Sequence, residues 1–524
     1  MKKRLFLPAI FAVALFAGQN ANAQDSVFSY KHQGTTLYYS VDGNNQATVR
    51  GPLPDTAYAS ELWPADAKPS GAVVIPDTVE HKGVRYPVVA LARKLFYKCT
   101  EVTRVTIPQA VTAIPFGAFA YTSIDSMTLH EGITRIDSAA FQTCYNLASI
   151  RIPNTVTKIQ GSSFYYDTSL ISIIVPSGVD TVEGGAFAYC VNLSSAILSE
   201  GVKCIENFAF SSCHRLAHIS LPSTLKTIGY NGFSQNESLV SLALPEGLTN
   251  VGGYAFYDCR SLRSVTLPST LESIGDGVFL FCLSIDSLVF PDAMRHLACD
   301  VMDSCISLTW CHLPASLEYI DSLTFNYCFS LRSIDMPQHI NSIRRGAFSE
   351  CSSLEHIEVP EGVTYIEEAA FDHSGLRTIH LPSTLTSIGY YTFYAANQLD
   401  TLFLACATPP TLDTGVFSNY NATLVVPCGA IEAYRQHSVW GSFANIVESC
   451  TGIGEPESTE VPVRITSRDG RIIVEGAEGE TVQVFDMAGR LAQTFRHSSV
   501  QALATGVYIV KVGNRPAKKV VVVR

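Results

Sequence analysis

Cysteine is the residue type in this chain that is best suited to chemistry, and its spacing is regular. The chain repeats itself about every 23 residues, and nine repeats have a cysteine at the same position. These are Cys99, Cys144, Cys190, Cys213, Cys259, Cys282, Cys305, Cys328 and Cys351. The same position in other repeats holds Thr122, Asp167, Asn236, Ser374 or Ala396. A nucleophile or a metal ligand would not recur in this way or tolerate these replacements, whereas a small buried group would. We therefore interpret the cysteine column as packing.

Three cysteines near the end of the repeats, Cys406, Cys428 and Cys450, lie outside the column. Exported proteins can form disulfides. Within the column, side chains in register point in parallel, which leaves their Cβ atoms too far apart to bridge. We expect free thiols in the column and one disulfide among the other three, with Cys428 and Cys450 as one pairing; the sequence leaves the choice open.

A chemically mixed set of side chains occupies solvent-facing positions of neighbouring strands: Trp310, His312, Asp335, His356, Glu358 and His380. The column of Trp310 and His356 is mostly Ser or Thr in other repeats, whereas the column of the other four is mixed. Stacked carboxylates repel each other, so we expect His380, Arg332 or Arg377 to compensate Asp335 and Glu358. Three interpretations stay open: a solvated charged face, a patch that binds a protein partner, or a divalent metal site made by Asp335, Glu358 and His380. Trp beside His and Arg is typical of protein-binding hot spots.

No catalytic motif with a suitable context occurs, whether H-E-x-x-H, P-loop, G-x-S-x-G or G-x-G-x-x-G. We therefore expect no enzyme activity and no cofactor. Without its first 23 residues the chain has 33 Lys+Arg and 47 Asp+Glu, a net charge of −14. This balance argues against nucleic acid as a partner. The charge is uneven, because residues 463–524 carry ten Lys+Arg and five Asp+Glu (+5), which leaves −19 for residues 24–462.

The elements that position these residues form a repeat of about 23 residues, P-x-x-[LV]-x-x-I-x(4)-F-x-x-C-x-x-L-x-x-[IV]-x-[LI]. In its aromatic column, 13 of 14 positions are Phe, and the exception is Met302. One repeat has too few apolar residues to close a core, but stacked repeats bury one continuous set. The [IV]-x-[LI] segment alternates with period two and predicts a strand. Thr227-Ile228 predicts a second short strand, and F-x-x-C predicts a tight turn or a single helical turn. The sequence therefore predicts a mainly β solenoid.

The repeat, with its AF-x-x-C-x-x-L-x-x-[IV]-x-[LI]-P pattern, resembles the BspA-like class of leucine-rich repeats. The resemblance covers about residues 71–405. It implies a right-handed solenoid of the kind found on bacterial surface and secreted proteins, some of which bind host extracellular matrix proteins or other cells.

Six segments are expected along the chain. Basic residues, the apolar run Leu5 to Ala17 and Ala21-Asn22-Ala23 predict a signal peptide over 1–23. An N-terminal β cap (24–70), the leucine-rich repeat solenoid (71–405), a capping unit (406–450), a linker (451–462) and a small β-sandwich (463–524) follow. The last segment resembles the C-terminal sorting domain of type IX secretion substrates, which implies that secretion machinery recognises it; a small accessory β module is the alternative. No later segment approaches the ~20 apolar residues of a membrane span.

The expected function is binding of proteins or glycans by an exported or cell-surface solenoid that has crossed the periplasm, in adhesion to host matrix or to other cells. A structural surface protein without a specific ligand is the alternative.

Tyrosines beside the Phe column predict an aromatic edge whose hydroxyls face water, which is a second candidate for adhesion. They are Tyr97, Tyr121, Tyr165, Tyr166, Tyr189, Tyr257, Tyr327 and Tyr394.

Overall fold

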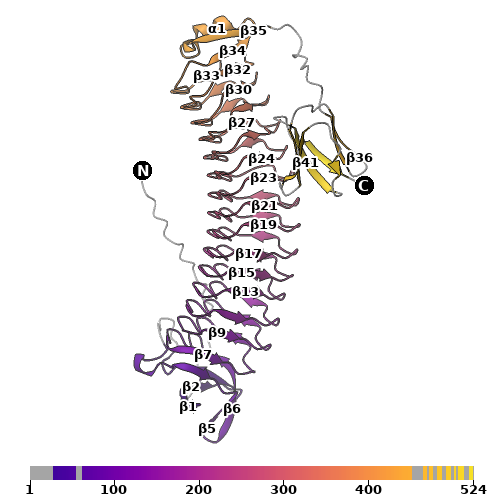
Figure 1. Cartoon of the computed structure of the whole chain (residues 1–524). Helices are drawn as coiled ribbons and strands as arrows, with labels where there is room; N and C mark the ends of the chain where they lie inside the picture. Colours follow the sequence, from indigo (N-terminus) through magenta and orange to yellow (C-terminus); the bar gives the residue numbers. More distant parts are fainter. Residues whose placement is uncertain are drawn as a thin grey trace.

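The computed structural model describes residues 27–54 and 62–450, together with the strands of the C-terminal region between residues 464 and 522. The predicted signal peptide (1–23) and linker (451–462) lie outside the described residues. The described chain is an elongated stack of coils, with a small β domain beside it at the level of β23 (Ser287–Val289) and β24 (Trp310–His312) (Figure 1). Among the described helices, none is long and apolar enough to cross a membrane.

The [IV]-x-[LI] segments form the first face of the solenoid, as predicted. Their alternation separates buried from exposed side chains: in β13, Ile173 and Val175 are buried while Ser172 and Ile174 are exposed. Neighbouring strands pair in parallel, for example Ser195 with His218. The strands of this face are β4 (Gly71–Val74), β7 (Val102–Thr106), β9 (Ser126–Thr128), β11 (Ser149–Arg151), β13 (Ser172–Val175), β15 (Ser195–Leu198), β17 (His218–Ser220), β19 (Ser241–Ala243), β21 (Ser264–Thr266), β23 (Ser287–Val289), β24 (Trp310–His312), β26 (Ser333–Ile334), β28 (His356–Glu358), β30 (Thr378–Leu381), β32 (Thr401–Leu404), β34 (Thr423–Pro427) and β35 (Asn445–Ser449). The face is divided into six short sheets, because no ladder among these described strands joins β7 to β9, β11 to β13, β17 to β19, β21 to β23 or β26 to β28.

Two-residue strands form the second face, and the predicted Thr227-Ile228 strand is one of them. They pair in two parallel sheets, which are separated because the coil containing His296 and Leu297 has no strand here. One sheet contains β8 (Ala113–Ile114), β10 (Arg135–Ile136), β12 (Lys158–Ile159), β14 (Thr181–Val182), β16 (Cys204–Ile205), β18 (Thr227–Ile228), β20 (Asn250–Val251) and β22 (Ser273–Ile274). The other contains β25 (Tyr319–Ile320), β27 (Ser342–Ile343), β29 (Tyr365–Ile366), β31 (Ser387–Ile388) and β33 (Thr411–Leu412).

The F-x-x-C segments form tight turns, as predicted. Around Phe256, the residues two before and two after it, Tyr254 and Asp258, have φ of 56° and 58°. The amide of Cys259 donates to the Phe256 carbonyl at 3.3 Å. The same left-handed pair recurs in successive coils, so the turn is a fixed part of the repeat.

The Phe rings stack into a buried column through the solenoid. Centroids of successive rings lie 5.1–5.8 Å apart from Phe96 to Phe279 and again from Phe325 to Phe417. Met302 fills the gap between these two stacks and is fully buried. Phe417 was not in the predicted column, and it carries the stack one coil into the C-terminal cap.

Both ends of the solenoid are closed. At the N-terminal end lies a mixed sheet in the order β1-β2-β3-β6-β5, whose strands come from the chain before β4 and after it. The Trp63 indole N–H donates to the Leu95 carbonyl at 2.5 Å. At the C-terminal end, Trp440 is buried against Phe417 and donates to the Pro410 carbonyl at 2.9 Å. The elements of the two ends are β1 (Phe28–His32), β2 (Thr35–Val41), β3 (Ala47–Arg50), η1 (Ala65–Ala67), β5 (Thr78–His81), β6 (Val84–Leu91), α1 (Ile431–Gln436) and η2 (Trp440–Ser442).

The C-terminal domain consists of short strands in two sheets, as predicted. One sheet has the order β36-β37-β40 and the other β39-β38-β41-β42. Its predicted first hairpin is present, since Arg468 pairs with Arg471. The strands are β36 (Arg464–Arg468), β37 (Arg471–Glu475), β38 (Thr481–Asp486), β39 (Leu491–Arg496), β40 (Gln501–Ala502), β41 (Gly506–Val512) and β42 (Lys518–Val522).

Candidate functional site

The six residues of the predicted patch all project from the first face, but they fall on two different sheets. Trp310 and His312 lie on β24, which pairs with β26, and Asp335 follows directly after β26. His356 and Glu358 lie on β28, which pairs with β30, the strand of His380. No ladder joins β26 to β28, because each belongs to its own sheet. The patch therefore has two halves.

The half on β24 and β26 is covered by the C-terminal domain. Trp310 is only 4% exposed, where the sequence predicted a solvent-facing position. The reason is Phe485 on β38, whose ring stacks on the indole with centroids 5.1 Å apart and planes at 15°. Val289 packs with both rings. The domain lies against this part of the stack in Figure 1.

A positive charge beside the Asp335 carboxylate is that of Lys511, which was not among the expected groups. Lys511 on β41 reaches the solenoid, donates to the Ser333 hydroxyl and is attracted by Asp335. Burial lowers the pKa of Lys511, and Asp335 opposes that change. Arg377, one of the two expected compensating arginines, instead lies 3.2 Å from Asp400.

The half on β28 and β30 is open. His356, Glu358 and His380 are exposed, and Glu358 stands beside His380 in the ladder. The His356 Nδ1 lies 2.5 Å from the Thr378 hydroxyl. The His380 ring stacks on Phe403 of β32, with centroids 4.2 Å apart and planes at 8°. This half presents two imidazoles, a carboxylate and an aromatic face on a rigid sheet.

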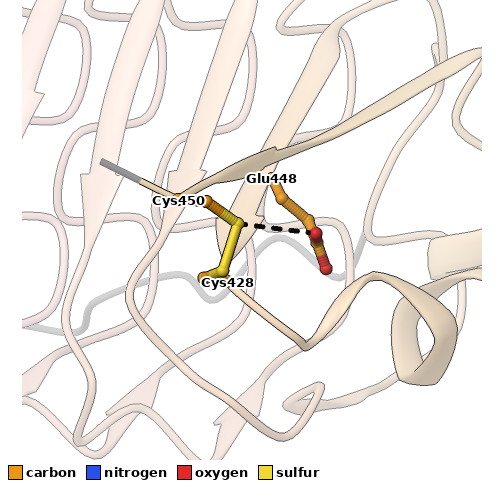
Figure 2. A group of neighbouring side chains, drawn as sticks. All are labelled: Cys428, Glu448 and Cys450. Atoms are coloured by element: carbon orange, nitrogen blue, oxygen red, sulfur yellow. Dashed lines mark hydrogen bonds between the residues drawn. A yellow bond between two sulfur atoms is a disulfide. The ribbon is translucent and has the colours of Figure 1, made fainter. Parts of the chain in front are cut away.

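The metal interpretation is not supported by the geometry of the described residues. Asp335, Glu358 and His380 do not bring their ligand atoms within 4.8 Å of one another. Across the described part of the chain, one group meets that criterion: Cys428, Glu448 and Cys450. The two cysteines form a disulfide, and the Cys450 sulfur lies 3.6 Å from the Glu448 carboxylate (Figure 2). Sulfur atoms in a disulfide are not thiolate ligands, so this group is not a metal site. The disulfide stabilises the cap and confirms the pairing of Cys428 with Cys450.

The cysteine column is buried and bonded to the backbone, as its interpretation as packing requires. The Cys259 thiol donates to the Phe233 carbonyl of the preceding coil at 3.2 Å, and the same bond recurs from Cys190, Cys213, Cys282, Cys305, Cys328 and Cys351. Burial raises the pKa of Cys213 and of Cys259 to about 12. A thiol that stays protonated is a poor nucleophile. Cys144 makes the equivalent bond to the Phe119 carbonyl, so eight of the nine column thiols satisfy a buried carbonyl of the preceding coil.

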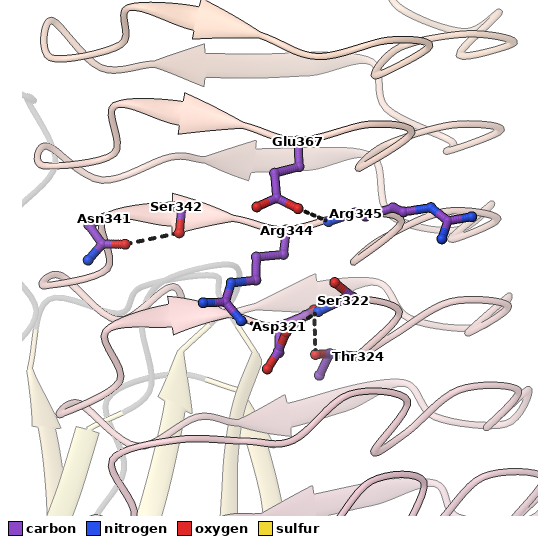
Figure 3. Close-up of polar contacts among 8 residues, drawn as sticks. All are labelled: Asp321, Ser322, Thr324, Asn341, Ser342, Arg344, Arg345 and Glu367. Carbon is purple, nitrogen blue, oxygen red and sulfur yellow. Dashed lines mark hydrogen bonds and ion pairs between the residues drawn. The ribbon is translucent and has the colours of Figure 1, made fainter.

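Acidic side chains beside the second face tie neighbouring coils together. The Arg344 guanidinium lies 3.0 Å from the Asp321 carboxylate, and the Glu367 carboxylate accepts the Arg345 amide at 3.0 Å (Figure 3). Near the break in this face, burial followed by repulsion from Asp303, Asp276 and Asp321 raises the pKa of Asp300 to about 6. Much of the acidity of the solenoid is thus used between coils.

The tyrosine edge has the exposure that the sequence predicts. Tyr166, Tyr189 and Tyr394 are exposed, and neighbouring rings meet edge to face or tilted, as Tyr165 and Tyr189 do at 5.4 Å. An adhesive role for this edge stays a second hypothesis, because its aromatic rings are distributed along much of the solenoid rather than gathered in one site.

Comparison with known proteins decides the family. The model of the BspA type leucine rich repeat region matches residues 89–207, 180–305 and 279–400. The chain belongs to the BspA-type leucine-rich repeat family. A second model, a domain of unknown function (DUF6383), matches residues 455–522 of this BspA-type protein. A search of curated proteins found no match.

One solved structure shares the fold of this BspA-type protein, and two others are similar to it at a lower level. A leucine-rich repeat protein from Bacteroides ovatus is 22% identical with a TM-score of 0.55, covering 80% of this chain and 97% of that one. A leucine rich cell surface protein from Faecalibacterium prausnitzii is 24% identical with a TM-score of 0.43, covering 73% and 96%. The pneumococcal vaccine antigen PcpA is 15% identical with a TM-score of 0.41, covering 80% and 98%.

Two residues at the patch of this BspA-type protein were missed by the sequence analysis, Phe485 and Lys511. Both lie in the C-terminal domain, far along the chain from the strands that they cover. The sequence held one signal: a tryptophan at a position that is mostly Ser or Thr in other coils needs a covering group.

Proposed function

We propose that this protein is an exported surface protein whose solenoid binds proteins or glycans, in adhesion to host matrix or to neighbouring cells. The observation that carries the proposal is the open half of the patch. His356, Glu358 and His380 are exposed on paired parallel strands, with Phe403 stacked on His380. Binding by side chains whose backbone is already fixed costs less conformational entropy than binding by a flexible loop.

A pull-down with the chain from Gln24 onward, on an array of extracellular matrix proteins and glycans, tests this function. A binding protein retains at least one ligand in physiological salt. The alternative, a structural surface protein without a specific ligand, predicts no retention above that of an unrelated acidic protein.

Export is the second part of the proposal. The basic and apolar N-terminal segment supports passage to the periplasm, and the C-terminal domain is proposed as the element that type IX secretion machinery recognises. Its separate composition, with a net charge of +5 over residues 463–524, supports a role distinct from that of the solenoid. Deletion of 463–524 in the producing cell should leave the protein in the periplasm. Surface display of the truncated chain would contradict this role.

A further inference from the structure

The covered half of the patch is built as an aromatic stack. Trp310 stands in a column whose other members include Ser264, Ser287 and Thr378, so its indole is the exception in this column. Phe485 lies over it with nearly parallel planes, and Val289 closes the side. An indole left uncovered here would add an apolar patch to a polar strip.

Lys511 adds a polar contact to this stack. It is 7% exposed, donates to the Ser333 hydroxyl and is attracted by Asp335. A buried ammonium is costly unless it is hydrogen-bonded and near a negative charge. Both conditions are met by residues of the solenoid, so the position of Lys511 fits this surface.

The C-terminal domain does not need these two side chains for its own core. Side chains alternate along a strand, so Phe485 and Gln483 lie on the face of β38 opposite to the buried Val482 and Val484. Gln483 is paired with Lys511 in the ladder, which places Lys511 on the same face as Phe485. This face is the one turned to the solenoid.

Charge favours the same contact. Residues 463–524 carry +5 and residues 24–462 carry −19. Surfaces of opposite sign attract each other, and salt weakens the attraction. The C-terminal domain is therefore a basic partner on an acidic solenoid.

We propose that the C-terminal domain is the resident occupant of the Trp310 half of the patch, and that an external protein displaces it by presenting the same two groups, an aromatic ring for Trp310 and a cation for Ser333 and Asp335. The second clause rests on the proposed binding function, whereas the first does not. The class of partner is a basic protein surface with an exposed aromatic side chain. A neutral glycan lacks the cation and is the competing outcome.

Acrylamide quenching of tryptophan fluorescence in the full chain tests the occupancy. Trp63, Trp310 and Trp440 are all buried, at 2%, 4% and 0% exposed, so quenching of the wild type is low. Phe485→Ala should make one tryptophan accessible, and Lys511→Gln should act in the same direction. The matched control is Thr494→Ala, an exposed position on β39 of the same sheet. In a Trp310→Phe background, Phe485→Ala should have no effect. Unchanged quenching in Phe485→Ala and in Lys511→Gln overturns the occupancy.

Binding of short peptides to the full chain tests the displacement. The probe alternates lysine and phenylalanine, its control alternates lysine and serine, and cellohexaose represents a neutral glycan. Phe485→Ala should bind the lysine–phenylalanine peptide about tenfold more tightly than the wild type, because the internal competitor is weakened, and should bind the serine peptide unchanged.

The two measurements separate the claims. Raised quenching without peptide binding keeps the occupancy and rejects protein binding at this half. Equal peptide binding by wild type and Phe485→Ala, or a preference for cellohexaose, overturns displacement by a basic protein.

Discussion

At the scale of single residues, the cysteine column shows how a repeat satisfies its buried backbone. Seven Phe carbonyls of the column accept a hydrogen bond from a cysteine thiol of the next coil. Asn236 is the instructive exception: it is fully buried, and neither its amide oxygen nor its amide nitrogen has a hydrogen-bond partner. Leaving such groups unpaired costs roughly 1–3 kcal/mol each.

Asn236→Cys should therefore stabilise the protein by about 1–3 kcal/mol, since it replaces unpaired polar atoms with the thiol that neighbouring coils use. Denaturant unfolding measures the change as a higher midpoint. The reverse substitution one coil later, Cys259→Asn, should lower the midpoint. A midpoint for Asn236→Cys at or below that of the wild type contradicts the role assigned to the column.

The same thiols predict alkaline sensitivity. The pKa of Cys213 and of Cys259 is raised from 9.0 to about 12 by burial. The unfolded chain therefore loses these protons first, so their contribution to stability is complete below pH 9 and falls as the pH rises from 9 to 12. Each raised pKa can contribute up to about 1.36 kcal/mol per pH unit in that window.

Thermal melts between pH 8 and pH 11 test this window. The double variant Cys213→Ala/Cys259→Ala should be less stable at pH 8 and should lose less stability up to pH 11 than the wild type. An equal loss in both proteins would assign the alkaline transition to other groups.

At the scale of elements, coils are joined by a side-chain motif in addition to the strand ladders. A Glu-Gly pair in one coil faces a Ser-Thr pair in the next: Glu361 accepts from the Ser383 amide at 3.0 Å and from its hydroxyl at 2.9 Å, while Thr384 accepts the Gly362 amide at 3.0 Å. Gly362 has φ of 106°, which a side chain would strain. The motif repeats at Glu200 with Ser223 and at Glu246 with Ser269.

This motif predicts acid sensitivity. Hydrogen bonds from Ser223 and Ser383 lower the pKa of Glu200 and of Glu361 below 4.5. A lowered pKa in the folded state gives stability that is present above pH 4.5 and lost as the pH falls below it. Glu361→Gln should therefore melt at a lower temperature than the wild type at pH 7 and should lose less between pH 7 and pH 3. Glu432→Gln, in an exposed pair on α1, is the control. If the melting temperature of Glu361→Gln falls as far between pH 7 and pH 3 as that of the wild type, the motif is not the source of the acid sensitivity.

Most of the solenoid was predictable because periodicity encodes it. Strand positions, the Phe column and the free thiols each recur many times, so single exceptions do not hide them. The break in the second face was not predicted, although Leu297 stands where most other coils have a β-branched residue such as Ile228. The alternation of Glu-Gly with Ser-Thr was also visible in the sequence and was missed, because its period is two coils.

At the scale of the whole molecule, the contact between the C-terminal domain and β24 divides the patch into a covered and an open half. This division was not predictable from the repeat, since Phe485 and Lys511 belong to a segment outside it and a single contact leaves no periodic signal. The arrangement brings the acidic solenoid and the basic domain together. It leaves His356, Glu358 and His380 exposed.

The affinity of the full chain for the best ligand of a matrix-protein and glycan array tests the central claim most directly. His380→Ala and His356→Ala should each weaken binding by about tenfold, equivalent to about 1.4 kcal/mol. The matched control Ser172→Ala, an exposed position of the same strand column, should leave it unchanged. Absence of any retained ligand, or equal affinity of the histidine variants and the wild type, would contradict a binding role for this face.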